Sequence, residues 1–344
     1  MSGSSTREVY NASLLKVVNL QALLDDDQQE RDKLFAAVKD EGFFYLDFRH
    51  VEGSSIILEL LEDMFRFQEE LFSLPDDQKT KYDVDTLSYM KLNGYKPKGR
   101  NKGGVENRDG FESWAIPKDG ALGISNEQFS RPDMIDANMG LVQGFMKHML
   151  TATGTIHASL SKALALDVGQ RFEDYHRAAK ASPCLLRMLK YHPQPIEERG
   201  PPQTPHTDLG SLTILFTKQP GLQVLPKGAH EWAFVEPKSG HAIVNVGDGL
   251  SMMTNGLFQS CLHRVSPLPD QSMQTRYSIA YLQRAEAHTR LTGLDSPAIP
   301  NRSSDSAVET SGEWLDKKFR MLRAKTHSED NEWILTGRSV PVPV

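Results

Sequence analysis

The spacing of apolar residues changes about halfway along this chain of 344 residues. In the first half, apolar positions recur with the period of 3.6 residues that gives an amphipathic helix one buried face. This pattern predicts helices over residues 26–39, 54–73 and 133–165, after a short strand-like segment within residues 9–20. The N-terminal half is therefore expected to be largely helical.

From residue 184 onward, short β-prone segments replace the helical pattern. Turn residues such as Pro226-Lys227-Gly228 and Lys238-Ser239-Gly240 separate them. Serial short strands with such turns are typical of a β-sandwich or barrel. The strands are predicted over residues 184–191, 211–216, 221–225, 231–235, 241–246, 260–265 and 275–282, and a final helix over 311–324. The fold class is therefore expected to be mainly β with flanking helices.

A polar stretch interrupts the helical half at residues 83–130. It is rich in Gly, Lys, Asn and Asp and includes the positively charged run of residues 96–104. Clusters of Gly and polar residues mark loops. We therefore expect residues 96–104 to form a mobile loop. Its positive charges are expected to be solvated and not to form an anion site.

Composition and charge narrow the class of protein. A net charge of -6 with 24% charged residues leaves no basic stripe, so nucleic acid is not an expected partner. Cys184 and Cys261 lie in apolar, strand-like runs and are predicted to be buried thiols, not a disulfide. No run approaches the ~18 apolar residues of a membrane span, and the first residues lack the apolar core of a signal peptide. We expect a cytoplasmic protein without membrane association, of open oligomeric state.

His206, Asp208 and His263 are the residues that point to chemistry. Two imidazoles and one carboxylate form the facial triad of non-haem Fe(II) oxygenases, which leaves three metal positions open. Residues i and i+2 of a strand share a face, so His206 and Asp208 can bind one ion from one strand. The pair follows a loop-like segment and precedes the β-prone residues 212–216.

Two other sequences of the form His-x-Glu occur, at His50-Val51-Glu52 and His327-Ser328-Glu329. Both lie beside helix-like segments, and neither opens a series of strands that contains a further histidine. We therefore assign the metal site to His206, Asp208 and His263.

Arg276 and Ser278 show the same i, i+2 spacing in the last predicted strand. A guanidinium and a hydroxyl on one face suit a small dicarboxylate, because arginine binds a carboxylate through two parallel charge-assisted bonds. Asp248, in Val246-Gly247-Asp248-Gly249, is interpreted as a turn residue bonded to its own backbone and not as a metal ligand.

Several motifs in order along the chain resemble those of one enzyme superfamily, the Fe(II)/2-oxoglutarate-dependent dioxygenases. The resemblance extends from about residue 10 to about residue 325 and is to the subfamily shared by isopenicillin N synthase and many plant and fungal natural-product oxygenases. The motifs are Glu41-Gly42-Phe43-Phe44-Tyr45, Phe72-Ser73-Leu74-Pro75, Asn93-Gly94-Tyr95, Gly221-Leu222-Gln223-Val224, Asn245-Val246-Gly247-Asp248, Thr254-Asn255-Gly256 and His263-Arg264-Val265.

The resemblance implies a fold and a division of the chain. The fold is a double-stranded β-helix, or jelly-roll, with an N-terminal helical region. Residues 1–180 would form the helical region that also covers the substrate, residues 181–300 the oxygenase core, and residues 301–344 a C-terminal helix and tail. Substrate contacts would come partly from residues 83–120.

The resemblance also implies cofactors and residue roles. The enzyme would use Fe(II), 2-oxoglutarate and O2, with ascorbate as reductant, and release succinate and CO2. Arg276, Ser278 and Tyr191 would contact the cosubstrate. Tyr191 lies in Leu189-Lys190-Tyr191-His192-Pro193, where many plant members have Asn-Tyr-Tyr-Pro-Pro; the asparagine is replaced by Leu189. Apolar candidates for substrate contact are Leu189, Phe216, Met252 and Met253.

The expected reaction is oxidation of a small, largely apolar metabolite. Secondary-metabolite biosynthesis is the expected setting, as in many similar fungal enzymes. Because halogenases of the superfamily lack the carboxylate ligand, Asp208 favours hydroxylation, desaturation, epoxidation or ring rearrangement over halogenation. Two alternatives stay open. One is an oxidase like isopenicillin N synthase, whose Arg-x-Ser binds substrate and which needs no 2-oxoglutarate. The other is a catalytically silent relative that only binds a small molecule.

Overall fold

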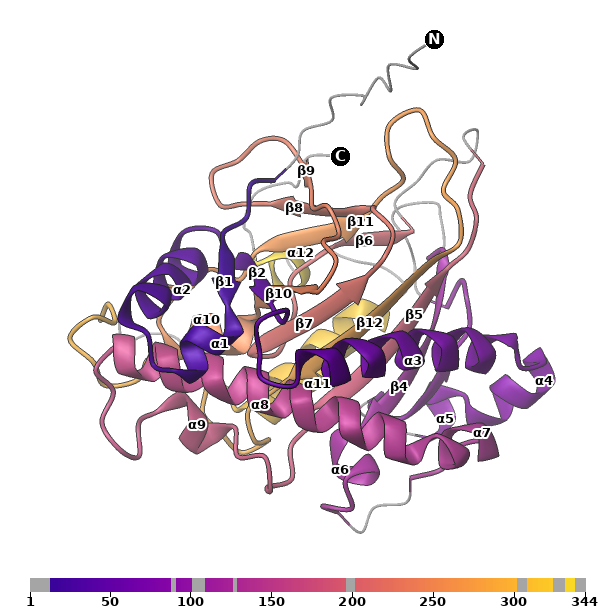
Figure 1. Cartoon of the computed structure of the whole chain (residues 1–344), viewed down its shortest axis with the longest axis horizontal. Helices are drawn as coiled ribbons and strands as arrows, with labels where there is room; N and C mark the ends of the chain where they lie inside the picture. Colours follow the sequence, from indigo (N-terminus) through magenta and orange to yellow (C-terminus); the bar gives the residue numbers. More distant parts are fainter. Residues whose placement is uncertain are drawn as a thin grey trace.

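Two β-sheets form the centre of the computed structural model, which describes residues 13–87, 91–100, 109–125, 129–195, 202–301, 308–323 and 332–337 (Figure 1). The larger sheet has eight strands in the order β1-β2-β10-β7-β12-β5-β4-β3, and the smaller has four in the order β6-β11-β8-β9. Neighbouring strands are antiparallel except β1 and β2.

The larger sheet draws its strands from the whole length of the chain. They are β1 (Val17–Asn19), β2 (Phe43–Asp47), β3 (Gly94–Lys96), β4 (Phe111–Pro117), β5 (Leu185–Tyr191), β7 (Leu212–Thr217), β10 (His241–Val246) and β12 (Arg276–Gln283). The smaller sheet contains β6 (Gln203–His206), β8 (Leu222–Leu225), β9 (Ala233–Phe234) and β11 (Leu262–Val265). All seven strands predicted after residue 184 are confirmed, with ends shifted by up to two residues.

Three strands in polar or loop-like segments were not predicted from the sequence. β3 and β4 lie within the polar stretch of residues 83–130, and β6 lies in the segment interpreted as a loop before His206. Six of the seven residues of β4 are buried, because it pairs with β5 along its full length. Its few apolar residues stand between Gly- and Lys-rich neighbours, so a composition average over the region hides the strand. Residues 101–104 of the predicted mobile loop lie outside the described residues.

Three long helices confirm the helical half of the prediction. They are α2 (Gln28–Asp40), α3 (Ser54–Ser73) and α8 (Met139–Ala163). The predicted helix of residues 133–165 is divided at Asn138, before which lies the short α7 (Asp133–Ala137). Asp27 caps α2 by accepting a hydrogen bond from the Glu30 amide at 2.8 Å.

Helices α3 and α8 lie side by side along one face of the larger sheet (Figure 1). The apolar stripe of α3 faces this sheet and α8, although Ile56, which the pattern placed on it, is 62% exposed. Gln68 of α3 is fully buried and donates to the carbonyls of Leu189 and Ser278, on β5 and β12. The helical layer therefore supports the strands that carry the predicted cosubstrate residues.

Shorter helices connect these elements and close the chain. They are α1 (Leu20–Leu24), α4 (Asp76–Lys79), η1 (Thr80–Tyr82), α5 (Val84–Leu87), α6 (Lys118–Ala121), α9 (Phe172–Tyr175), α10 (Asp248–Met253), α11 (Ser311–Arg323) and α12 (Glu332–Thr336). Helix α11 confirms the prediction for residues 311–324 to within one residue. The division of the chain at residues 180 and 300 stays a prediction; strands β1 to β4 join the same sheet as the core strands.

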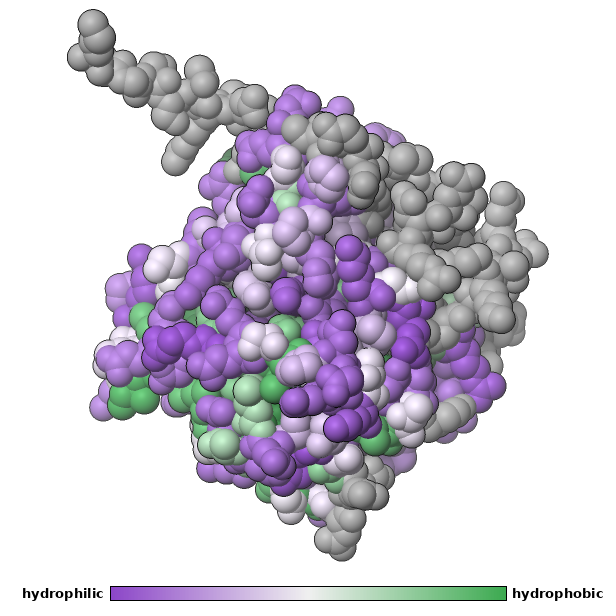
Figure 2. Space-filling view, turned by 90° about the vertical axis from the view of Figure 1, so that its right-hand side faces the viewer, coloured by the Kyte–Doolittle hydropathy of each residue, from purple (hydrophilic) through white to green (hydrophobic). Residues whose placement is uncertain are grey.

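The remaining expectations about the chain concern its thiols and its surface. Cys184 and Cys261 are buried free thiols, as predicted. None of the described helices is long and apolar enough to cross a membrane. The face shown in Figure 2 is mainly hydrophilic, with apolar residues in small groups.

Candidate metal centre and cosubstrate pocket

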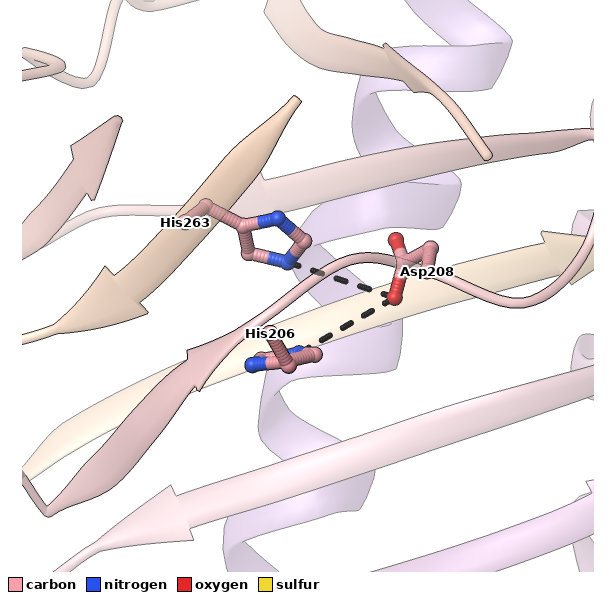
Figure 3. Close-up of side chains that lie close together, drawn as sticks. All are labelled: His206, Asp208 and His263. Atoms are coloured by element: carbon pink, nitrogen blue, oxygen red, sulfur yellow. Dashed lines mark ion pairs between the residues drawn. The ribbon is translucent and has the colours of Figure 1, made fainter. Parts of the chain in front are cut away.

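The structure brings His206, Asp208 and His263 together between the two sheets (Figure 3). One ligand atom of each lies within 4.8 Å of the others. Asp208 Oδ1 is 4.0 Å from His206 Nε2 and 3.9 Å from His263 Nε2. Among the described residues, this is the group of histidine, cysteine and acidic side chains that could hold a metal ion.

Cross-strand pairing aligns the two histidines. His206 ends β6, and His263 is its direct partner on β11. Each ring is oriented through Nδ1, which lies 2.8 Å from Thr204 O in His206 and 3.2 Å from Cys261 O in His263. If Nδ1 carries the proton, Nε2 presents its lone pair to the space beside Asp208, which is the arrangement of metal-binding histidines.

Asp208 lies beyond the end of β6, in the loop that leads to β7. The prediction that it shares a strand with His206 is therefore wrong, although the two side chains still converge. The loop is held by a close crossing at Gly247, where a Cβ would come within 2.3 Å of Gly210 O. The Asp248 amide also donates to Asp208 O at 2.7 Å. These contacts, and not a regular strand, fix the position of the Asp208 carboxylate.

Two donors orient the Asp208 carboxylate. Thr213 Oγ1 and Asn245 Nδ2 donate to Oδ2 at 2.6 and 2.8 Å, which leaves Oδ1 toward the histidines. Burial opposes ionisation, but the two imidazoles and these hydrogen bonds outweigh it and hold the pKa of Asp208 well below its usual range. Burial, together with the neighbouring His263, lowers the pKa of His206 to about 3. The triad is thus a carboxylate with a neutral imidazole at His206, the form that binds metal.

Arg276 and Ser278 lie side by side in the same cavity as the triad. Arg276 is 2% exposed, and its Nη1 donates to Ser278 Oγ at 3.5 Å. Its Nε donates to Pro220 O at 3.1 Å, whereas the buried Nη2 has no acceptor among the described residues. A buried guanidinium with an unused donor is costly unless an anion completes its hydrogen bonds. The pocket therefore fits a carboxylate.

Tyr191 adjoins this guanidinium. It is the register partner of Arg276 across β5 and β12, and the Arg276 Cζ atom is 5.1 Å from its ring centre. Its hydroxyl donates to Gln203 Oε1 at 2.6 Å, and Gln203 Nε2 lies 3.3 Å from His206 Nε2. Burial raises the pKa of Tyr191 to about 12, so the hydroxyl remains a donor at neutral pH. Gln203 thus bridges the arginine pocket and the triad.

The cavity around these groups has a volume of about 170 Å³. Alternating residues of three strands line it, and Leu189 is among them. Phe216, Met252 and Met253, also predicted to contact substrate, do not line it. Phe216 points to the opposite face of β7, against Phe48 and Phe145, because its neighbour Leu215 faces the cavity. The two methionines belong to helix α10 and contribute to the main core.

Lys318 of helix α11 connects the C-terminal region to the triad. Its buried ammonium donates at 2.7 Å to both the carbonyl and the hydroxyl of Thr207, the residue between two triad members. It also forms an ion pair with Asp248, which corrects the interpretation of Asp248 as a turn residue bonded to its own backbone. From α12, Leu335 O accepts from the Thr207 amide at 2.9 Å.

Sequence reasoning assigned no role to several of these residues. Thr213 and Gln203 contact triad members a few residues away, whereas Asn245 and Lys318 reach the triad segment from elements distant in sequence. Asn245 occurred in a resemblance motif, which was a usable signal. Of the competing His-x-Glu sequences, His50 and Glu52 are exposed in a turn, and residues 327–329 lie outside the described residues.

Two family models match separate parts of this chain. Residues 182–285 match the family described as 2OG-Fe(II) oxygenase superfamily, and residues 15–134 match the one described as non-haem dioxygenase in morphine synthesis N-terminal. The 2-oxoglutarate-dependent dioxygenase frbH of Dothideomycetidae sp. is 31% identical over 97% of this chain and 98% of its own length. This chain belongs to the Fe(II)/2-oxoglutarate-dependent dioxygenases.

Other members of the family agree with this assignment. The 2-oxoglutarate-dependent dioxygenase gloE of Glarea lozoyensis is 31% identical over 94% of this chain and 92% of its own length. A full-length Neurospora crassa protein solved in complex with alpha-KG superimposes with a TM-score of 0.75, at 21% identity over 93% of this chain and 100% of its own. It has also been solved with alpha-KG and thymine. The likeness confirms the jelly-roll fold.

The dioxygenase family implies Fe(II), 2-oxoglutarate and O2, and the residues present fit them. The three side chains of the triad converge with one oriented lone pair or carboxylate oxygen each. The unused donor of Arg276 faces the same cavity. Both observations are independent of the sequence comparisons.

Proposed function

We propose that this dioxygenase oxidises a small organic molecule with Fe(II) bound by His206, Asp208 and His263. The distal carboxylate of 2-oxoglutarate would bind Arg276 and Ser278. One observation carries the proposal: a convergent triad and a buried, incompletely bonded arginine lie in one cavity between the sheets.

Each residue has a distinct task in this proposal. The backbone carbonyls at Thr204 and Cys261 hold the imidazole rings so that Nε2 faces the ion. Thr213 and Asn245 hold one carboxylate oxygen of Asp208, so the other is free to bind. When bound, iron, 2-oxoglutarate and O2 supply the oxidising power, and succinate and CO2 leave. The protein's part is orientation and the exclusion of water from the site.

Tyr191 and Leu189 complete the pocket on the β5 side. The Tyr191 hydroxyl stays protonated and can donate, whereas Leu189 provides an apolar wall where many plant members have asparagine. Phe111 and Leu215 also line the cavity, which suits a substrate with an apolar body. Hydroxylation, desaturation, epoxidation and ring rearrangement all fit a site that keeps its carboxylate ligand.

The biological setting belongs to the same proposal. The relatives frbH and gloE are fungal 2-oxoglutarate-dependent dioxygenases of nearly the same length, in keeping with a role in secondary-metabolite biosynthesis. Two buried cysteines that form no disulfide are in keeping with a reducing, cytoplasmic environment. The substrate would be a small molecule.

The test is turnover of 2-oxoglutarate. Protein purified without oxygen is mixed with Fe(II), ascorbate and 2-oxoglutarate, O2 is admitted, and succinate is measured over time. We expect succinate from the wild type, none from Asp208→Ala or His206→Ala, and a normal amount from the control His50→Ala. Succinate from the triad variants at the wild-type rate would refute the assigned site. Oxidation of a substrate without consumption of 2-oxoglutarate would instead indicate an oxidase like isopenicillin N synthase.

A further inference from the structure

A second arginine lies in the cavity, at the opposite end of the strand that carries Arg276. Along β12, the residues that line the cavity alternate: Arg276, Ser278, Ala280 and Leu282, followed by Arg284 just past the strand. At about 3.3 Å per residue, the backbones of Arg276 and Arg284 are roughly 26 Å apart. The two guanidiniums therefore approach the cavity from different ends.

The triad lies near the end at which Arg284 is found. Leu282 is the register partner of Thr213, and Thr213 donates to the Asp208 carboxylate. The side chain of Arg284 also approaches Gly210, where a Cβ would lie 2.8 Å from Arg284 Cγ. Arg276 thus lies on one side of the metal site along the strand, and Arg284 lies on the other.

Arg284 is buried and forms no ion pair with a carboxylate among the described residues, although the charge of Asp208 acts on it and raises its pKa. It is 1% exposed, and its Nη1 donates to Pro183 O at 2.7 Å. Its Nε has no acceptor in the described part of the chain. Two other charged groups of the cavity wall have their own partners: Asp109 pairs with Lys96, and Lys318 pairs with Asp248. Asp208 faces the histidines.

The surroundings of Arg284 favour the binding of an anion. Burial, and then the positive charge of Arg187 on β5, lower the pKa of Arg284 to about 9, so it is still protonated at neutral pH. Arg187 lines the same cavity. A buried cation beside a second cation is costly unless an anion binds there. The Nε edge of a guanidinium suits a carboxylate, which can accept two parallel bonds.

We propose that Arg284 binds a carboxylate of the primary substrate, so that this enzyme oxidises a small organic acid with an apolar body. The inference rests on the proposed function and adds the substrate class. It assigns the two buried arginines to different anions: Arg276, with Ser278 and Tyr191 beside it, to the cosubstrate, and Arg284 to the substrate. A molecule held at Arg284 would extend into the cavity that Asp208 also lines.

The experiment compares acids with their uncharged amides. Protein is loaded with Mn(II), which replaces Fe(II) without turnover, and with 2-oxoglutarate. Benzoate, 3-phenylpropanoate and octanoate are titrated by calorimetry against their primary amides. The variants are Arg284→Gln, Arg284→Lys, which preserves the charge should the first not fold, and the control Arg264→Gln. Arg264 pairs with Gln223 and stacks on Trp232, outside the cavity wall.

We expect at least one acid to bind the wild type and Arg264→Gln about 10- to 100-fold more tightly than its amide. This preference should vanish in Arg284→Gln and partly persist in Arg284→Lys, with 2-oxoglutarate affinity unchanged throughout. The proposal is overturned if no acid binds the wild type, or if the preference survives in Arg284→Gln. It is also overturned if that variant loses 2-oxoglutarate, because Arg284 would then serve the cosubstrate. Failure of the wild type itself to bind 2-oxoglutarate would refute the proposed function instead.

Discussion

Replacing Arg276 with glutamine tests the cosubstrate pocket most directly. The change removes a buried positive charge but preserves much of the side-chain length. In the wild type, Nη1 meets Ser278 Oγ, and Nη2 is left for a ligand. The variant would therefore face a carboxylate with one neutral donor in place of a charged pair.

The structure sets the expected size of the effect. A hydrogen bond to a charged group contributes about 1.5–3 kcal/mol, and the glutamine amide can replace part of the lost pair. A net loss of about 3 kcal/mol corresponds to a KM for 2-oxoglutarate raised roughly 100-fold. Arg276→Lys should show a smaller rise, because it retains charge but cannot bind in the parallel, two-bond geometry.

The assay is succinate formation as 2-oxoglutarate is varied, with a thermal unfolding scan as companion. Because the wild-type guanidinium is buried and incompletely bonded, Arg276→Gln should be as stable as the wild type, or more so, when no cosubstrate is present. Mn(II) alone should still raise the Tm of the variant, because the triad is intact, but the further rise that 2-oxoglutarate adds should disappear. An unchanged KM, or a variant that still gains stability from 2-oxoglutarate, would refute the reasoning and place the dicarboxylate elsewhere.

Two further predictions concern groups that support the metal site, and a third concerns Glu112 of β4, a buried carboxylate that does not line the cavity. Asn245→Leu removes a donor to the carboxylate of Asp208, so Mn(II) affinity measured by calorimetry should fall about 10- to 100-fold while the fold persists. Unchanged affinity would show that the hydrogen bond from Thr213 is enough to orient the carboxylate. Lys318→Met leaves the buried Asp248 carboxylate without its cation and should lower the free energy of unfolding, measured in urea, by about 3–5 kcal/mol. Adding Asp248→Asn to this variant should restore part of the lost stability. A loss of less than about 1 kcal/mol in Lys318→Met would contradict this prediction. Burial opposes ionisation of Glu112, but its hydrogen bonds and ion pairs outweigh this effect and lower its pKa to about 2. The ionised carboxylate therefore stabilises the folded protein above pH ~4.5, and this contribution is lost as the pH falls toward 2. Urea titrations of the wild type and Glu112→Gln should differ by about 3 kcal/mol at pH 7 and converge near pH 2; a constant difference would refute the linkage.

The sequence predicted much of the fold because periodicity reports burial. The long helices α3 and α8 and the strands after residue 184 show regular apolar spacing, and all were found near their predicted ends except the start of α8, which lies six residues after the predicted one. Strands β3 and β4 were missed because they are buried by pairing, β3 with β4 and β4 with β5. Their amino-acid composition does not set them apart from the polar residues around them. Phe216 was misplaced because an apolar residue in a buried sheet can face either side.

The chemistry of the site divides in the same way. The sequence alone determined the kinds of ligand, since two histidines, an aspartate and an Arg-x-Ser pair appear in it as residue types at fixed spacings. The alternation along β12 also places Arg284 on the cavity side with Arg276. Only the tertiary structure decided that Asp208 reaches the metal site from a loop, that Asn245 and Lys318 support it, and that Arg284 Nε is buried with no acceptor among the described residues. Spacing along a strand is a local property of the backbone, whereas the partners of a buried charge come from whichever elements pack against it.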